Sequence, residues 1–158
     1  MMVLTLDTSC FEAGSKELAD LMMLCENGKI QIQVSPVTME EIIKDHPKKI
    51  KQYVEYLRLV KKIEENRLED AKKYDEIARK VMFIHSPRTK NDAMTDKRVI
   101  QRIKSDPNEY AKWALKPEHM NAFMDVEIFT QHVMTGADFF VTKDRKGFIN
   151  DGHSHLNP

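Results

Sequence analysis

Short apolar runs alternate with stretches of helical periodicity along this chain. The apolar runs predict buried strands over residues 2–6, over residues 30–34, where isoleucine and valine alternate with glutamine, and over residues 138–142. Apolar residues spaced three or four apart predict amphipathic helices from about Ser15 to Cys25 and over residues 120–133. Strands and helices that alternate in this way indicate an α/β fold, a three-layer α/β/α sandwich with a central, mainly parallel sheet.

A long stretch without glycine or proline, residues 48–86, lies between the second predicted strand and the last one. Its apolar residues recur every three to four positions, which predicts one long helix or two helices that turn near Asn66. Shorter helices are predicted over residues 97–104 and 109–115. We interpret the whole region, at about 44–116, as an extended helical insert.

The length of 158 residues fits one domain, residues 1–158, that carries this insert. No apolar run is long enough for a membrane-spanning helix. The first residues have no basic segment and meet an acid at Asp7, so we expect no signal peptide. The two cysteines, Cys10 and Cys25, favour free thiols and a reducing, cytoplasmic location.

The 25 basic and 25 acidic side chains are unevenly distributed along the chain. Residues 44–104 hold 18 basic and 10 acidic residues, whereas the rest of the chain holds 7 and 15. The net charge of zero therefore combines a basic insert with an acidic remainder. This pattern excludes a uniformly basic nucleic-acid binder. It leaves open whether the insert contacts RNA or simply carries a solvated lysine-rich face.

Acidic side chains follow two of the predicted strands. Asp7 comes directly after the first strand and Asp144 follows the last one, and the carboxyl ends of parallel strands meet at one edge of a sheet. Glu41, after the second strand, and Asp125, near the start of the final helix, are candidates to join them. Taken singly, each acid is also typical of a turn, of a helix start or, with Thr38 as the cap, of a capping box.

Carboxylates that lie close together favour either a shared proton or a divalent cation. Mg²⁺ and Mn²⁺ prefer oxygen ligands and combine a few carboxylates with substrate phosphate. The hydroxyl groups of Thr8, Ser9 and Thr142 flank the acids and are candidates to position a water or a phosphate. The residues alone therefore predict an acidic site at the carboxyl edge of the sheet.

Three stretches carry a resemblance to a known family: VLTLDTSCF at the start, VSPVTMEEI after the second strand, and MDVEIFTQHVMTGADFFVTKDRKGF near the end. They fall within roughly residues 2–43 and 118–149, about half of the chain. In these stretches the chain resembles the PIN-domain family of Mg²⁺/Mn²⁺-dependent nucleases, which have an α/β/α fold. The final stretch is the most specific of the three.

The resemblance implies a catalytic site made of four acids, and all of them except the glutamate would bind the metal. These acids are Asp7, Glu41, Asp125 and Asp144. Glu40 is the alternative to Glu41, because two consecutive glutamates allow the match to shift by one position. Ser9 and Thr142 match the supporting hydroxyl positions. The residues that bind RNA are not identified by the resemblance.

The implied activity is that of an endoribonuclease, a hydrolase that cleaves RNA phosphodiester bonds with Mg²⁺ or Mn²⁺ as cofactor. The alternative is an RNA- or protein-binding module with little activity of its own, or a toxin controlled by an antitoxin. The expected partners are RNA and an antitoxin or another protein, and a homodimer is left open. A response-regulator receiver domain is disfavoured because the acid after the first strand is single.

Overall fold

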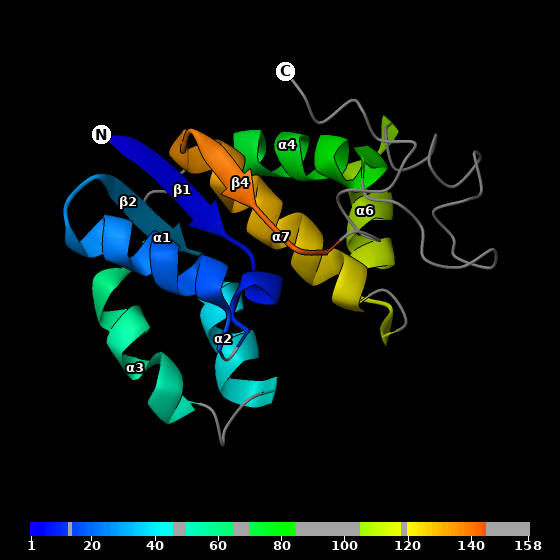
Figure 1. Ribbon diagram of the computed structural model, residues 1–158. Helices are drawn as coiled ribbons and strands as arrows, with labels where there is room; N and C mark the ends of the chain where they lie inside the picture. Colours follow the sequence, from blue (N-terminus) through cyan, green and yellow to red (C-terminus); the bar gives the residue numbers. More distant parts are fainter. Residues whose placement is uncertain (13, 46–49, 65–69, 85–104, 118–119, 145–158) are drawn as a thin grey trace. The chain divides into compact units, whose positions relative to one another are not determined.

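The chain forms two compact units, seen in the computed structural model (Figure 1). The first, here called the sheet unit, comprises Met1–Glu69 and Gln131–Lys143, and the second, the helical unit, comprises Asp70–Thr130 and Asp144–Pro158. The structure describes residues 1–12, 14–45, 50–64, 70–84, 105–117 and 120–144.

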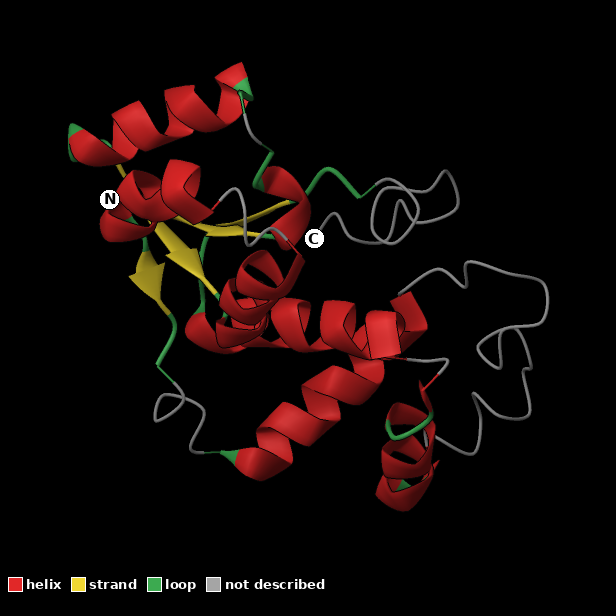
Figure 2. Ribbon diagram, turned by 90° about the horizontal axis from the view of Figure 1, so that it is seen from below, coloured by secondary structure: helices red, strands yellow, loops and turns green. Residues whose placement is uncertain are grey.

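The sheet unit contains four parallel strands in the order β3-β2-β1-β4. Strands β1 (Met2–Leu6), β2 (Ile30–Val34) and β4 (Phe139–Val141) confirm the three predicted from the apolar runs. They lie side by side in Figure 2, and β1 lies between the other two. The predicted parallel α/β class is therefore confirmed, and β1 is a central strand.

Alternation along the strands separates the two faces of the sheet. Leu4 and Leu6 of β1 face a buried apolar cluster that also contains Met22 of α1 (Lys16–Glu26) and Tyr53 of α3 (Ile50–Leu59). Thr5 alternates with these leucines and contacts the last turns of the final helix on the other face. Helical residues thus pack on both faces of the sheet within this unit.

Helix α1 forms as its sequence predicts. The side chain of Ser15 accepts a hydrogen bond from Leu18 N and caps the first turn. After the helix, Gly28 has a φ of 66°, a left-handed conformation that glycine adopts without the steric cost that other residues incur. The apolar spacing, the Ser15 cap and the glycine after the helix are therefore sufficient to predict α1 from the sequence.

Helix α2 (Pro36–Asp45) begins earlier than the capping-box pattern predicts. Ser35 precedes the helix, and its hydroxyl oxygen accepts a hydrogen bond from Thr38 N at 3.1 Å. The prediction that Thr38 caps the helix is wrong, because serine followed by proline is the more favourable helix start. Glu41 consequently lies in the second turn of the helix, beyond the capping position.

The described part of residues 48–86 forms two helices and not one, which rejects the first of the two predicted alternatives and agrees with the second. Helix α3 ends at Leu59, strand β3 (Lys61–Lys62) follows, and a separate helix, α4 (Ala71–Ile84), begins later. The edge of β2 explains the interruption, because its backbone groups form hydrogen bonds with the residues that follow α3. For example, Ile63 N donates to Val34 O at 2.9 Å. Tertiary pairing here overrides a helical apolar spacing.

The helical unit contains α4, α6 (Pro107–Ala114) and most of α7 (Met120–Thr135), which continues into the sheet unit at Gln131. Helix α6 confirms the helix predicted over 109–115, with a proline as its first residue. The predicted helix over 97–104 lies outside the described residues. None of the helices in the described ranges is long and apolar enough to cross a membrane.

Candidate functional site

Asp7 follows the central strand β1 and is almost completely buried, with 3% of its surface exposed. One carboxylate oxygen, Oδ1, accepts a hydrogen bond from Thr8 N at 2.8 Å. The other, Oδ2, accepts hydrogen bonds from the hydroxyls of Ser9 and Thr142, each at 2.7 Å. These donors fix the orientation of a buried carboxylate and offset much of the cost of burying it.

The sheet topology explains why residues from the two ends of the chain meet here. Strands β1 and β4 are parallel neighbours, with Leu6 opposite Val141. The residues that follow them, Asp7 and Thr142, therefore emerge at the same edge of the sheet. The backbone continues this pairing, since Asp7 N donates to Val141 O at 3.0 Å.

Glu41 joins this group from helix α2. Its Oε2 atom accepts a hydrogen bond from the hydroxyl of Thr8, the first residue of the short 3₁₀ helix η1 (Thr8–Cys10). Glu41 is half-buried, whereas Glu40 is exposed, so Glu41 is the member of the pair that lies in the group. We call the five residues that share these contacts the Asp7 cluster: Asp7, Thr8, Ser9, Glu41 and Thr142.

The other two predicted acids belong to the helical unit. Asp125 lies in α7 and Asp144 follows Lys143, and both are half-buried. The structure brings Asp7 and Glu41 together; the participation of Asp125 and Asp144 stays a prediction. Within the described ranges, no three His, Cys, Asp or Glu side chains are grouped closely enough to hold a metal ion. The cluster itself offers carboxylate and hydroxyl oxygens, the ligand type that Mg²⁺ and Mn²⁺ prefer.

Lys143 places a positive charge beside the cluster, and the sequence reasoning missed it. Its backbone N–H donates to Ser9 Oγ at 2.9 Å, and its ammonium group donates to Glu12 Oε2 at 3.0 Å and to Ser15 Oγ at 3.3 Å. The hydrogen bond with Glu12 raises the pKa of Lys143 above its usual value. Its position between Thr142 and Asp144 is the signal that could have found it, since both neighbours are candidate site residues.

Cys10 lies at the end of η1 and does not have the character of a nucleophile. Its thiol is buried and donates to Val141 O at 3.1 Å. Burial, reinforced by the negative charge of Asp7, raises the pKa of Cys10 to about 11. The thiol is therefore protonated at neutral pH. Both Cys10 and Cys25 are free thiols, as predicted.

A second polar group lies on the sheet face that contacts α7. Gln33 Nε2 donates to Thr5 Oγ1 at 2.9 Å and to Thr135 Oγ1 at 2.6 Å, and His132 Nδ1 lies 2.9 Å from Thr5 Oγ1. The imidazole also packs against Phe140, with ring centroids 5.4 Å apart and ring planes inclined at 51°. Burial lowers the pKa of His132, which favours the neutral ring. We call Thr5, Gln33, His132 and Thr135 the neutral network, in which His132 is a packed residue.

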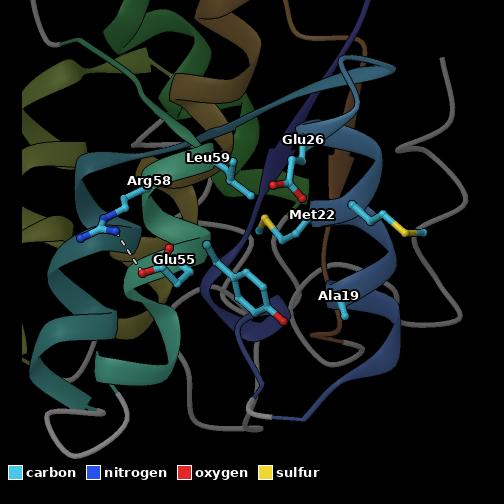
Figure 3. A pocket seen from close by; sticks show the side chains of 8 residues that line it. Ala19, Met22, Glu26, Glu55, Arg58 and Leu59 are labelled. Carbon is cyan, nitrogen blue, oxygen red and sulfur yellow. Dashed lines mark hydrogen bonds and ion pairs between the residues drawn. The ribbon is translucent and has the colours of Figure 1, made fainter.

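A shallow hollow lies between α1 and α3 (Figure 3), and its lining includes no residue of the Asp7 cluster. Its sides combine apolar groups, such as Met22 and Leu59, with the ion pair between Arg58 and Glu55 at 3.1 Å. The complete lining is Ala19, Met22, Met23, Glu26, Glu55, Tyr56, Arg58 and Leu59. This surface contains no nucleophile or hydroxyl cluster comparable to that around Asp7.

No family model, no curated protein and no solved structure matches this chain.

Proposed function

We propose that this protein is a metal-dependent endoribonuclease with a PIN-like, three-layer α/β/α fold. The observation that carries the proposal is the Asp7 cluster, where hydrogen bonds join the buried Asp7 to Ser9 and Thr142. Glu41 is linked to the same group through Thr8. Asp7, Ser9, Glu41 and Thr142 match motif positions of the PIN family in the sequence. They gather at the carboxyl edge of a parallel sheet, where ligands of α/β proteins commonly bind.

Each residue has a distinct role in this proposal. Asp7 binds the metal through its carboxylate, and the sequence resemblance adds Asp125 and Asp144 as the other ligands. Glu41 binds the metal or orients the attacking water. A bound Mg²⁺ or Mn²⁺ would neutralise the scissile phosphate and lower the pKa of the attacking water. Ser9 and Thr142 keep the Asp7 carboxylate in one orientation, since both hydroxyls donate to the same oxygen.

The substrate in this proposal is RNA, held partly by the basic stretch over residues 44–104. The described part of this stretch exposes lysines that face solvent, and they include Lys51, Lys61, Lys62, Lys72 and Lys73. When lysine neutralises phosphate it releases counterions, so RNA affinity should fall steeply as salt concentration rises. Replacing Lys61 and Lys62 with glutamine should lower the affinity and reduce the salt slope by about 0.7 for each phosphate that the variant no longer neutralises.

Cleavage of RNA by the purified protein tests the proposal. Labelled structured and unstructured RNAs are incubated with Mg²⁺ or Mn²⁺, and then with excess EDTA. We expect cleavage that requires the metal and is abolished in Asp7→Asn and Asp144→Asn. Asp20→Asn is the matched control, because Asp20 is an exposed acid on α1 outside the cluster. Full cleavage by the Asp7 and Asp144 variants would show that the assigned site is wrong.

A protein-binding role, alone or as control of a toxin by an antitoxin, is the second candidate. The observation that favours it is the apolar part of the hollow of Figure 3, whose lining includes Met23, which is 53% exposed, and Leu59, which is 36% exposed. Methionine-rich surfaces adapt readily to partner side chains. Sedimentation of the purified chain would reveal a homodimer, and loss of that association in Met23→Lys would locate it here. A cytoplasmic location agrees with the two free thiols.

A further inference from the structure

Thr8 contacts both carboxylates of the Asp7 cluster. Its amide N–H donates to Asp7 Oδ1 at 2.8 Å, and its hydroxyl donates to Glu41 Oε2. We propose that Thr8 is a positioning residue that holds the Glu41 carboxylate in a fixed place relative to Asp7. This inference rests on the proposed nuclease function, in which Glu41 binds the metal or orients water.

The two acids differ in burial and in the length of their side chains. Asp7 is buried and accepts hydrogen bonds from three different residues. Glu41 reaches the cluster from α2 through a longer side chain and is only half-buried. A glutamate side chain loses considerable rotamer freedom when it is fixed, so a directed donor is needed to select one position. A hydroxyl that donates to a carboxylate is among the stronger hydrogen bonds in proteins.

Thr8 is itself well placed to act as that donor. It begins η1 directly after β1, and its carbonyl oxygen accepts a hydrogen bond from Phe11 N at 3.0 Å. Its backbone is thus held on both sides, by Asp7 at the amide and by Phe11 at the carbonyl. Threonine is also restricted at χ1 because its side chain is branched at Cβ. The hydroxyl of Thr8 is therefore restricted to few positions even without its contact to Glu41.

The alternative is that this hydrogen bond only attaches α2 to η1. Positioning predicts a loss of activity when the hydroxyl is removed, whereas attachment predicts a loss of stability. Thr8→Val keeps the branched shape and the amide hydrogen bond but removes the hydroxyl. Thr8→Ser keeps the hydroxyl. Thr38→Val is the matched control, since Thr38 lies on α2, is completely buried, and its hydroxyl has no hydrogen-bond partner among the described residues.

The experiment measures kcat and KM for RNA cleavage with Mn²⁺, together with the melting temperature of each variant. We expect Thr8→Val to lower kcat about 10- to 100-fold, as is typical when a metal-site residue loses its support. KM for RNA and the melting temperature should stay close to those of the parent. Thr8→Ser should restore most of kcat, and Thr38→Val should keep the parental value. The inference is overturned if Thr8→Val keeps the parental kcat, or if Thr8→Ser loses as much activity as the valine variant.

A crystal structure separates this inference from the proposed function. If the parent protein cleaves no RNA with either metal, the nuclease proposal fails, and the position of Glu41 in crystals of the parent and Thr8→Val then decides the role of Thr8. Positioning by Thr8 is supported if the Glu41 carboxylate is displaced in the crystals of Thr8→Val and keeps its place in those of the parent. A carboxylate that stays in the same place in both proteins overturns it.

Discussion

The Asp7 cluster and the neutral network are two buried polar groups that begin only two residues apart on the chain. Thr5 belongs to β1 and anchors the neutral network, whereas Asp7 follows the same strand and anchors the cluster. The neutral network joins sheet to helix through uncharged groups, with Gln33 at 5% exposure. The cluster contains two carboxylates, and its outer members are half-buried and accessible.

This difference indicates which group is built for stability and which for chemistry. A closed network of neutral partners satisfies the polar atoms it buries and specifies how the last turns of α7 dock on the sheet. A carboxylate with an accessible neighbour retains the capacity to bind a cation. We therefore expect substitutions in the cluster to change activity more than stability, and substitutions in the network to do the reverse.

The largest effect is expected for Asp7→Asn. Loss of the charge should lower metal-dependent RNA cleavage by at least about a thousand-fold, a loss typical of groups that stabilise charge in the transition state. The asparagine side chain keeps the shape of Asp7, so the loss of stability should not exceed about 1–3 kcal/mol. Cleavage rates and urea unfolding of the same preparation measure both quantities. A variant that cleaves RNA at the parental rate but unfolds at lower urea concentration would show that Asp7 contributes to stability and not to catalysis.

The thiols of Cys10 and Cys25 should differ strongly in reactivity. The pKa of Cys10 is raised to about 11 from an ordinary 9.0, which lowers its thiolate fraction at pH 8 about a hundred-fold relative to an ordinary cysteine. Cys25 is half-buried, so iodoacetamide should modify it first, as peptide mass spectrometry would show. Equal rates are expected only in guanidinium. Equal rates in the folded protein would contradict the burial of the Cys10 thiol.

Gln33→Leu tests the stabilising role of the neutral network. The substitution removes the donor that serves both Thr5 and Thr135, which should cost about 1–3 kcal/mol. For a chain of this length, each kcal/mol lowers the melting temperature by about 2–4 °C. The control is Gln31→Leu, at a half-buried position of the same strand, with an expected change within about 0.5 kcal/mol. Identical melting temperatures for the two variants would show that the hydrogen bonds of Gln33 do not stabilise the protein.

The smallest effect is the pH dependence contributed by His132. Burial lowers the pKa of His132 in the folded protein, so the unfolded chain binds this proton more readily. The stabilising contribution is therefore complete above the unfolded pKa of about 6.5 and declines as the pH falls below it, by at most about 1.4 kcal/mol per pH unit. Urea unfolding of the parent and His132→Gln between pH 8 and pH 5 isolates this term. Curves that stay parallel over the whole range would show that His132 does not contribute.

Much of the candidate site could be predicted because its residues directly follow strands with clear apolar patterns. Asp7 and Thr142 are predictable in this way, since the end of an apolar run and the parallel topology together determine where they emerge. The position of Glu41 is harder to assign. The helix starts at Pro36, and this start determines that Glu41 faces Thr8 while Glu40 faces solvent.

Other features were not predictable from local pattern. Strand β3 consists of two lysines and has no apolar alternation from which it could be predicted. It forms because it pairs with the edge of β2. The neutral network joins one polar residue from each of two strands to two from a helix, and none of them is unusual within its own segment. The contact of Thr8 with Glu41 likewise depends on how α2 approaches η1. Each of these features is a consequence of tertiary packing.

The pairing of β1 with β4 has a consequence for the order of events during synthesis. Strands β1 and β2 are separated only by η1 and α1, but the hydrogen bond from Thr142 to Asp7 spans 135 residues. Chains emerge from the ribosome starting at the N-terminus, and contacts between distant segments form late. Asp7 therefore lacks the hydrogen bond from Thr142 until synthesis has passed that residue. Under the proposed ribonuclease function, a chain that is still shorter than this on the ribosome would lack a completed site.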